Sequence, residues 1–136
     1  MLFRSFLTQL KDEALSKKLR NVHFHGYTDP RPFLEKAKIF LMTSSFEGYG
    51  MVIVEAQAYG VVPVAFNSFP ILSYMFMDFK AGVGVEPFSI EDYTQKVIDL
   101  IENEQKINDF VTFGKGAVER FLPSKIAQDW VSLFKL

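Results

Sequence analysis

The stretch that decides the fold is Ser44–Ala56, which reads SSFEGYGMVIVEA. It follows the short apolar run Ile39–Thr43, which is typical of a buried strand. It contains two glycines and then the start of a further segment, Met51–Tyr59. Three successive β-branched residues early in that last segment favour a strand by propensity alone. We predict a helix instead, because good helix formers follow and Gly60 is a natural stop. A second strand so close to the first would also leave no room for a crossover helix.

Outward from this stretch, short apolar runs alternate with longer amphipathic ones. The predicted strands are Val22–Gly26, Ile39–Thr43, Val61–Phe66 and Ala81–Val85. The predicted helices are one from Met1 to about Arg20, then Pro32–Lys38, Met51–Tyr59, Ile90–Asn103, Glu104–Phe121 and Lys125–Phe134, with a short helix or turns at Phe69–Phe79. This alternation predicts an α/β fold, a Rossmann-like, doubly wound parallel sheet flanked by helices.

Two local signals refine the prediction. Pro63 interrupts the third strand and indicates an irregular start or a sheet edge, because proline cannot donate to a ladder. Ser89 is a predicted helix N-cap, with Asp92 in the position that a capping box gives to glutamate.

Composition limits the class of protein. The 136 residues fit one domain, residues 1–136, and the 49% of hydrophobic residues argue against disorder. A net charge of −1 provides no basic field, so we expect no nucleic-acid partner. The chain has no cysteine, which excludes a disulfide framework and a thiolate metal site and is compatible with the cytoplasm.

No apolar run approaches the roughly 18–20 residues that span a bilayer, and the N-terminus lacks the features of a signal peptide. The first twenty residues are nevertheless basic, with Arg4, Lys11, Lys17, Lys18 and Arg20 against Asp12 and Glu13. A solvated helix face is the simpler interpretation. Peripheral contact of the full protein with the inner face of the membrane stays open.

The Ser44–Ala56 stretch also carries the chemistry. In open α/β sheets, ligands bind beyond the carboxyl ends of the strands, where this loop begins. Gly48 and Gly50 allow the backbone to approach a ligand, and the free N–H groups of the following helix suit a phosphate or diphosphate. The carboxylates of Glu47 and Glu55 could accept hydrogen bonds from sugar hydroxyls. The alternative is a solvated Glu47, a surface Glu55 and a turn needed only for geometry.

A resemblance favours the functional interpretation. Glu47–Gly50, then Glu55 followed by alanine, then Gly60–Ala65 (GVVPVA), resemble the signature of the group-one family of retaining GT-B glycosyltransferases. The flanking segments agree, because Asn21–Gly26 resembles the family's strand-plus-glycine entry and the last two predicted helices resemble its C-terminal helices. The resemblance covers about residues 20–134 and implies the C-terminal, donor-binding half of a GT-B fold.

The resemblance also implies the site. Glu47 would be the catalytic residue beside the donor sugar, and Glu55 would bind the nucleotide ribose. Backbone groups would hold the rest of the donor: Gly48, Tyr49 and Gly50 at the sugar or diphosphate, and Gly26 and Tyr27 beside the base. The family usually needs no obligatory metal, so we expect neither a metal site nor a cofactor, with a nucleoside-diphosphate sugar as the donor substrate.

Parts of the family pattern are missing from this chain. They are the N-terminal acceptor-binding domain and the opening of the donor domain, with the basic residues that neutralise the diphosphate. Asn67–Pro70 also departs from the usual glycine-rich turn. We therefore expect the chain alone to be inactive.

Several residues have simpler explanations. His23 and His25 alternate along a predicted strand without a third metal ligand nearby, and Asp78 with Lys80 reads as a polar turn. The apolar stripe around Trp130 on the last helix could be exposed, support self-association or fold onto the sheet. Two other functions remain open: a docking module that assembles with a partner chain, and an unrelated nucleotide-binding α/β protein.

Overall fold

The computed structural model describes residues 2–134 and divides into two compact units, which meet between Pro30 and Arg31 and are described separately. The predicted helix start at Met1 lies outside the described residues. In the first unit, α1 (Leu2–Ser16) is shorter than predicted. It ends because Lys18 takes a left-handed conformation (φ 54°), while the Leu19 N–H donates to the Ala14 carbonyl at 2.9 Å. This is the closure of a Schellman motif.

The predicted strand Val22–Gly26 is wrong. This segment is irregular, and Gly26 turns the chain with a φ of 69°. An alternating pattern shows which residues suit a strand, but a strand also needs a neighbouring strand to satisfy its backbone groups. The described residues provide no such neighbour for this segment.

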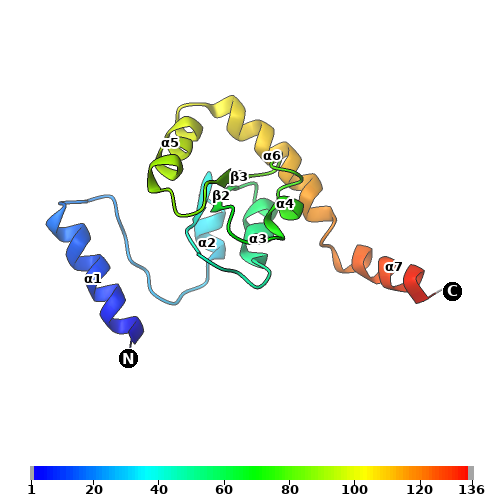
Figure 1. Cartoon of the computed structure of the whole chain (residues 1–136), viewed down its shortest axis with the longest axis horizontal. Helices are drawn as coiled ribbons and strands as arrows, with labels where there is room; N and C mark the ends of the chain where they lie inside the picture. The colour runs from blue at the N-terminus through cyan, green and yellow to red at the C-terminus, as the bar shows by residue number, and fades with distance from the viewer. Residues whose placement is uncertain (1, 135–136) are drawn as a thin grey trace. The chain divides into compact units, whose positions relative to one another are not determined.

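The second unit contains a parallel sheet in the order β1 (Ile39–Met42), β2 (Val62–Phe66), β3 (Val83–Val85). The register pairs Leu41 with Val64 and Ala65 with Gly84. The helices are α2 (Arg31–Leu34), α3 (Met51–Ala58), α4 (Leu72–Met75), α5 (Ile90–Ile101), α6 (Glu104–Glu119) and α7 (Pro123–Phe134), as Figure 1 labels them. The predicted α/β fold class is confirmed.

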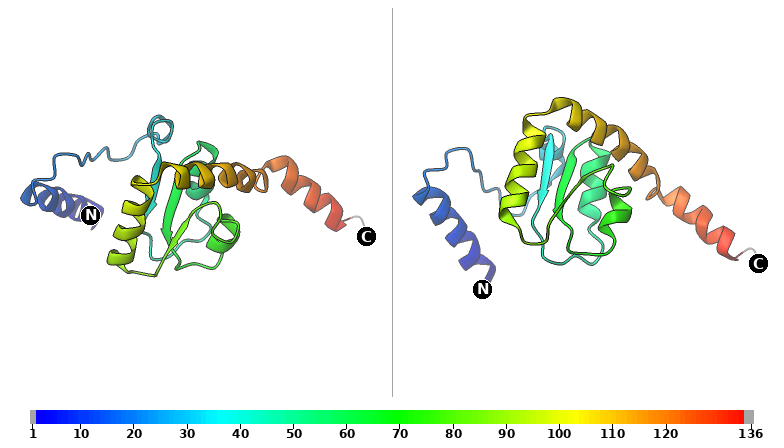
Figure 2. Two further views of the ribbon diagram at one scale, coloured as in Figure 1. Left: turned by 90° about the horizontal axis from the view of Figure 1, so that it is seen from above. Right: turned by 45° about the horizontal axis from the view of Figure 1, so that its top comes forward.

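Helices cover both faces of the sheet (Figure 2). On one face, Val62, Val64 and Phe66 pack against side chains of α5 and the first half of α6. On the other face, Met42 and Ala65 pack against α3, α4 and the end of α6. Successive side chains of β2 point to opposite faces of the sheet, and every residue of β2 is buried. Both faces of this central strand are therefore covered, as a doubly wound sheet requires.

Pro63 does not mark an edge, because β2 is the central strand. The preceding N–H, of Val62, donates to the Lys38 carbonyl at 3.0 Å, on the side of β1. The missing N–H of Pro63 therefore falls on the side of β3, whose pairing begins only at Val64. The proline sits at the strand start and removes no ladder hydrogen bond.

Phe69–Phe79 forms the predicted short helix with turns. After α4, residues Met77, Asp78 and Phe79 all have positive φ, between 49° and 65°. This conformation costs free energy in L-residues. It places the Phe79 ring directly against Gly84 of β3, while the neighbouring Phe76 ring lies against Gly82. A side chain at either glycine would collide with a ring, so close ring packing accompanies the unusual turn.

The predicted stop of α3 and cap of α5 are confirmed, whereas α2 ends at Leu34, before the predicted end at Lys38. Gly60 follows α3 with a φ of 72°, and Ser89 caps α5 by accepting from the Asp92 N–H at 3.2 Å. Asp92 does not complete the capping box. Its carboxylate instead accepts from Lys96 Nζ and from the Glu86 N–H, and the contact with Lys96 is the main cause that lowers its pKa.

The last helix, α7, has no buried side chain, and the Trp130 and Phe134 rings stack on it with centroids 5.7 Å apart. Within residues 2–134, no helix is both long and apolar enough to cross a membrane.

Candidate functional site

The loop that carries the predicted site connects β1 to α3. Because the three strands are parallel, the carboxyl ends of β1, β2 and β3 meet at one edge of the sheet, and this loop leaves from that edge. Tyr93 of α5, which packs on the face of the sheet opposite to α3, fixes the end of β1. Its hydroxyl donates to the Val64 carbonyl at 2.7 Å and lies 3.4 Å from the Met42 carbonyl. Burial raises the pKa of Tyr93 to about 12.

Gly50 is the N-cap of α3 and takes a left-handed conformation, with φ 81° and ψ 38°. A Cβ at this position would lie 3.6 Å from the Phe69 ring and 3.7 Å from Ile53. No side chain caps the helix. The N-terminus of α3 thus keeps N–H groups and a positive dipole end for an external acceptor, as an anion site requires.

Gly48 differs from Gly50. A Cβ there would meet nothing within 4 Å, so space rather than packing surrounds it. A ligand could approach the backbone at this point without displacing a side chain.

The two predicted carboxylates are available. Glu47 is half-buried in the loop, and Glu55 is exposed, one turn into α3. In the part of the chain that the structure describes, neither carboxylate forms a hydrogen bond or an ion pair. Both can therefore accept hydrogen bonds from a ligand.

The opposite side of α3 is fixed in the core. Ile53, Val54 and Ala56 are buried, and so is Gln57, whose Nε2 donates to the carbonyls of Met75 and Ala81. These bonds tie α3 to both ends of the turn after α4, so the helix that carries Glu55 is a rigid support.

The structure adds Ser68, which the sequence did not single out as a site residue. Its hydroxyl lies 3.3 Å from the Ser44 carbonyl and joins the loop after β2 to the start of the loop after β1. A small hydroxyl residue just past a parallel strand is a weak signal for such a bond. Its partner could not be read from the sequence.

The ring of Tyr49 was also missed, since only its backbone was assigned a role. It lies edge-on to Phe121, just beyond the end of α6, with ring centroids 6.3 Å apart. Phe121 in turn contacts Tyr74 of α4 at 5.7 Å. These residues lie far apart in the sequence, so no local pattern predicts their contact.

Gly26 and Tyr27 belong to the first unit, and the Tyr27 side chain is fully exposed. Their predicted place beside a base stays a prediction. Within the described residues, no group of three or more histidine, cysteine or acidic side chains is arranged to hold a metal ion.

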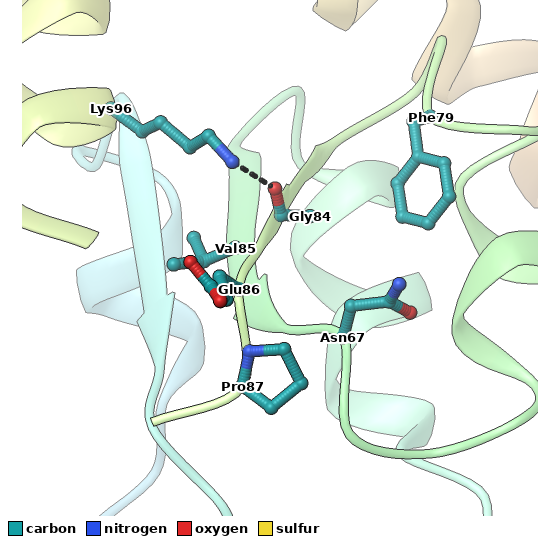
Figure 3. Close-up of a pocket in the computed structure, with 7 residues that line it drawn as sticks. All are labelled: Asn67, Phe79, Gly84, Val85, Glu86, Pro87 and Lys96. Atoms are coloured by element: carbon teal, nitrogen blue, oxygen red, sulfur yellow. Dashed lines mark hydrogen bonds between the residues drawn. The ribbon is translucent and has the colours of Figure 1, made fainter. Parts of the chain in front are cut away.

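A surface pocket of about 330 Å³ lies further along the same edge, and Figure 3 shows its lining. Asn67 follows β2 and Glu86 follows β3, while Phe79 and Lys96 contribute side chains from the flanking segments. Lys96 is already engaged, because its Nζ donates to the Gly84 carbonyl and to Asp92. None of the predicted site residues lines this pocket, which is therefore separate from the loop at 44–50.

Comparison with known proteins identifies the family. The family model described as Glycosyl transferases group 1 matches residues 5–116, which is most of the chain. The chain belongs to this family. Membership was predicted from the Glu47–Gly50 and Glu55 pattern and is confirmed.

Two curated relatives of this group 1 glycosyltransferase chain are bacterial. It is 31% identical over 117 residues to the poly(ribitol-phosphate) alpha-N-acetylglucosaminyltransferase of Staphylococcus aureus (strain COL), covering 85% of this chain and 24% of the relative. It is 28% identical over 124 residues to the poly(glycerol-phosphate) alpha-glucosyltransferase of Bacillus subtilis (strain 168), covering 90% of this chain and 18% of the relative. The chain thus spans a quarter or less of these relatives' lengths.

The fold agrees with the family. The crystal structure of TarM superposes on this group 1 glycosyltransferase chain with a TM-score of 0.80 and 28% identity, covering 95% of this chain and 26% of TarM. The sheet and its helices therefore match part of a GT-B glycosyltransferase structure.

Proposed function

We propose that this chain is the donor-binding part of a retaining glycosyltransferase that takes a sugar from a nucleoside-diphosphate sugar. The observation that carries the proposal is the loop at 44–50. It combines an uncapped helix N-terminus, open space at Gly48 and two unengaged carboxylates at the ligand edge of a parallel sheet.

Each part has a role in this proposal. The N–H groups of Gly50 and the first turn of α3 hold the diphosphate and stabilise the negative charge that develops on it as the sugar leaves. Glu55 accepts hydrogen bonds from the ribose hydroxyls. Glu47, half-buried in the loop, lies beside the sugar as the catalytic residue.

The relatives suggest the acceptor class. Both are named for transfer of a hexose or an N-acetylated hexosamine to a polymer of alditol phosphate, and both names specify an α linkage. We propose a hydroxyl of a poly(alditol phosphate) as acceptor. An α-linked product from an α-linked nucleotide sugar is the outcome of retention.

Calorimetric titration of the purified chain with UDP, GDP and ADP and their common sugars tests donor binding. We expect saturable binding with preference for one base. Glu55→Ala should weaken it about tenfold or more, the usual cost of losing hydrogen bonds to a charged group. Glu119→Ala, which removes an exposed glutamate from α6, should leave it unchanged. Absence of binding, or equal affinity in Glu55→Ala, would overturn the proposal.

A second assay separates binding from turnover. The chain incubated with donor and a poly(alditol phosphate) should transfer no sugar, because acceptor binding and closure of the cleft need a further domain. Transfer by the chain alone that disappears in Glu47→Gln would contradict this part and would place all catalytic groups within these residues.

A further inference from the structure

In the loop at 44–50, the backbone around Tyr49 is poorly restrained by the adjacent residues of the chain. Tyr49 lies between Gly48 and Gly50, and glycine allows the backbone wide conformational freedom. The hydrogen bond from Ser68 reaches the loop only at its first residue, Ser44. At the other end, Gly50 is fixed as the N-cap of α3. Between these points, the side chain of Tyr49 is the group that can fix the backbone.

That side chain contacts a row of aromatic rings. Tyr49 meets Phe121 edge-on, with an interplanar angle of 84°, and Phe121 meets Tyr74 edge-on at 80°. Edge-to-face pairs at these distances are the favourable arrangement of aromatic rings. We call Tyr49, Phe121 and Tyr74 the aromatic bridge.

The far end of the bridge is anchored. The Arg120 guanidinium lies 3.7 Å from the centre of the Tyr74 ring, and its Nη1 donates to the Tyr74 carbonyl at 3.0 Å. Phe121 also packs against the core cluster around Ile53 and Leu72. The bridge therefore connects the loop at 44–50 to α4, to the end of α6 and to the core.

We propose that Phe121 is a positioning residue, which orders the loop at 47–50 through Tyr49 before a ligand binds, with Tyr74 and Arg120 holding it in place. The role in ligand binding rests on the function proposed above. An ordered loop loses less conformational entropy on binding than a mobile one, so the bridge increases affinity without touching the ligand.

Order of the free loop is the first measurement, because it needs no ligand. Backbone amide relaxation by NMR should give order parameters of about 0.85 for Gly48 and Tyr49 in the wild type. In Phe121→Leu these order parameters should fall toward about 0.6. Phe121→Tyr keeps a ring and should restore them. Phe113→Leu is the matched control, because Phe113 lies exposed on α6, upstream of Phe121, and forms no ring contact among the residues that the structure describes.

Affinity is the second measurement. Phe121→Leu should bind the preferred nucleotide about three- to tenfold more weakly, the range expected from one aromatic pair, while Phe113→Leu and Phe121→Tyr bind as the wild type does. Denaturant unfolding of each variant separates this effect from a general loss of stability.

The outcomes distinguish the two proposals. Unchanged loop order in Phe121→Leu would overturn the positioning role, whatever binds. The loop could be ordered in the wild type and loosen in Phe121→Leu while the wild type binds no nucleotide. That result would support the bridge and refute the donor site. Equal loosening in Phe113→Leu would also overturn the bridge, because it would show a non-specific effect of changing α6.

Discussion

At the scale of single residues, the two glycines of the loop have different reasons to be glycine. Gly50 needs its left-handed conformation to end the loop and begin α3, and the Phe69 ring closes in on it. Gly48 has neither restriction. The fold therefore does not require glycine at this position, and the donor site proposed above would give its open space a use.

This difference is testable by two alanine substitutions. Gly50→Ala should lower the free energy of unfolding by about 1–2 kcal/mol, because alanine must adopt the left-handed region. Gly48→Ala should change it by less than about 0.5 kcal/mol, as for an unconstrained surface site. Urea unfolding followed by circular dichroism measures both. Equal losses would show that the loop conformation is not the one described.

At the scale of elements, the end of α1 departs from the sequence prediction at a residue that is poorly suited to it. Lys18 adopts the left-handed conformation that closes the helix, a position where glycine is usual. Lys18→Gly should raise helix content and stability by up to about 1 kcal/mol, since the steric cost disappears. Helicity by circular dichroism is the measurement. A loss of helicity would mean that the closing turn does not form.

The contact between β3 and the turn after α4 gives a second prediction at this scale. Gly84→Ala should destabilise the chain by about 1–3 kcal/mol, because the new methyl group overlaps the Phe79 ring. Gly116→Ala on α6 is the control, since open space surrounds it, and a helix-interior alanine should stabilise slightly. Thermal unfolding compares them. A neutral Gly84→Ala would show that Phe79 moves aside freely.

The same scale explains what the sequence could predict. Periodicity and caps identified the helices and the three strands of the second unit, because these signals are local. The segment Val22–Gly26 failed because a strand also depends on a neighbour. The position of Pro63 depends on the order of strands, which no local pattern contains.

The candidate site follows the same division. Glu47, the two loop glycines and Glu55 were found because they lie within one short stretch of sequence. Ser68 and Phe121 reach that stretch from other elements, and Tyr74 contacts it only through Phe121. Only the tertiary structure brings them together.

At the scale of the whole molecule, Tyr93 joins one face of helices to the middle of the sheet. The neutral hydroxyl donates to the Val64 carbonyl, and burial raises its pKa to about 12, above the ordinary tyrosine value of about 10. The folded state therefore retains this proton at a pH where the unfolded chain loses it. The stability that this proton provides is complete below pH 10 and is lost as the pH rises through about 12.

Tyr93→Phe should consequently lower the free energy of unfolding by about 1 kcal/mol near neutral pH, the net worth of one hydrogen bond. Between pH 10 and 12 the variant should lose stability less steeply than the wild type. Denaturant unfolding at a series of pH values measures both effects. Parallel pH profiles would show that the Tyr93 hydroxyl is not buried in solution.

The exposed face of α7 has a consequence for how unfolding of this chain must be observed. The chain has a single tryptophan, Trp130, which is 55% exposed and stacked on Phe134 within α7. Its fluorescence reports on α7 and not on the sheet, whereas circular dichroism sums all the helices and strands. Transitions recorded by these two signals need not coincide. Such a mismatch would reflect where the fluorophore lies, and a tryptophan introduced beside β2 would be needed to make emission follow the core.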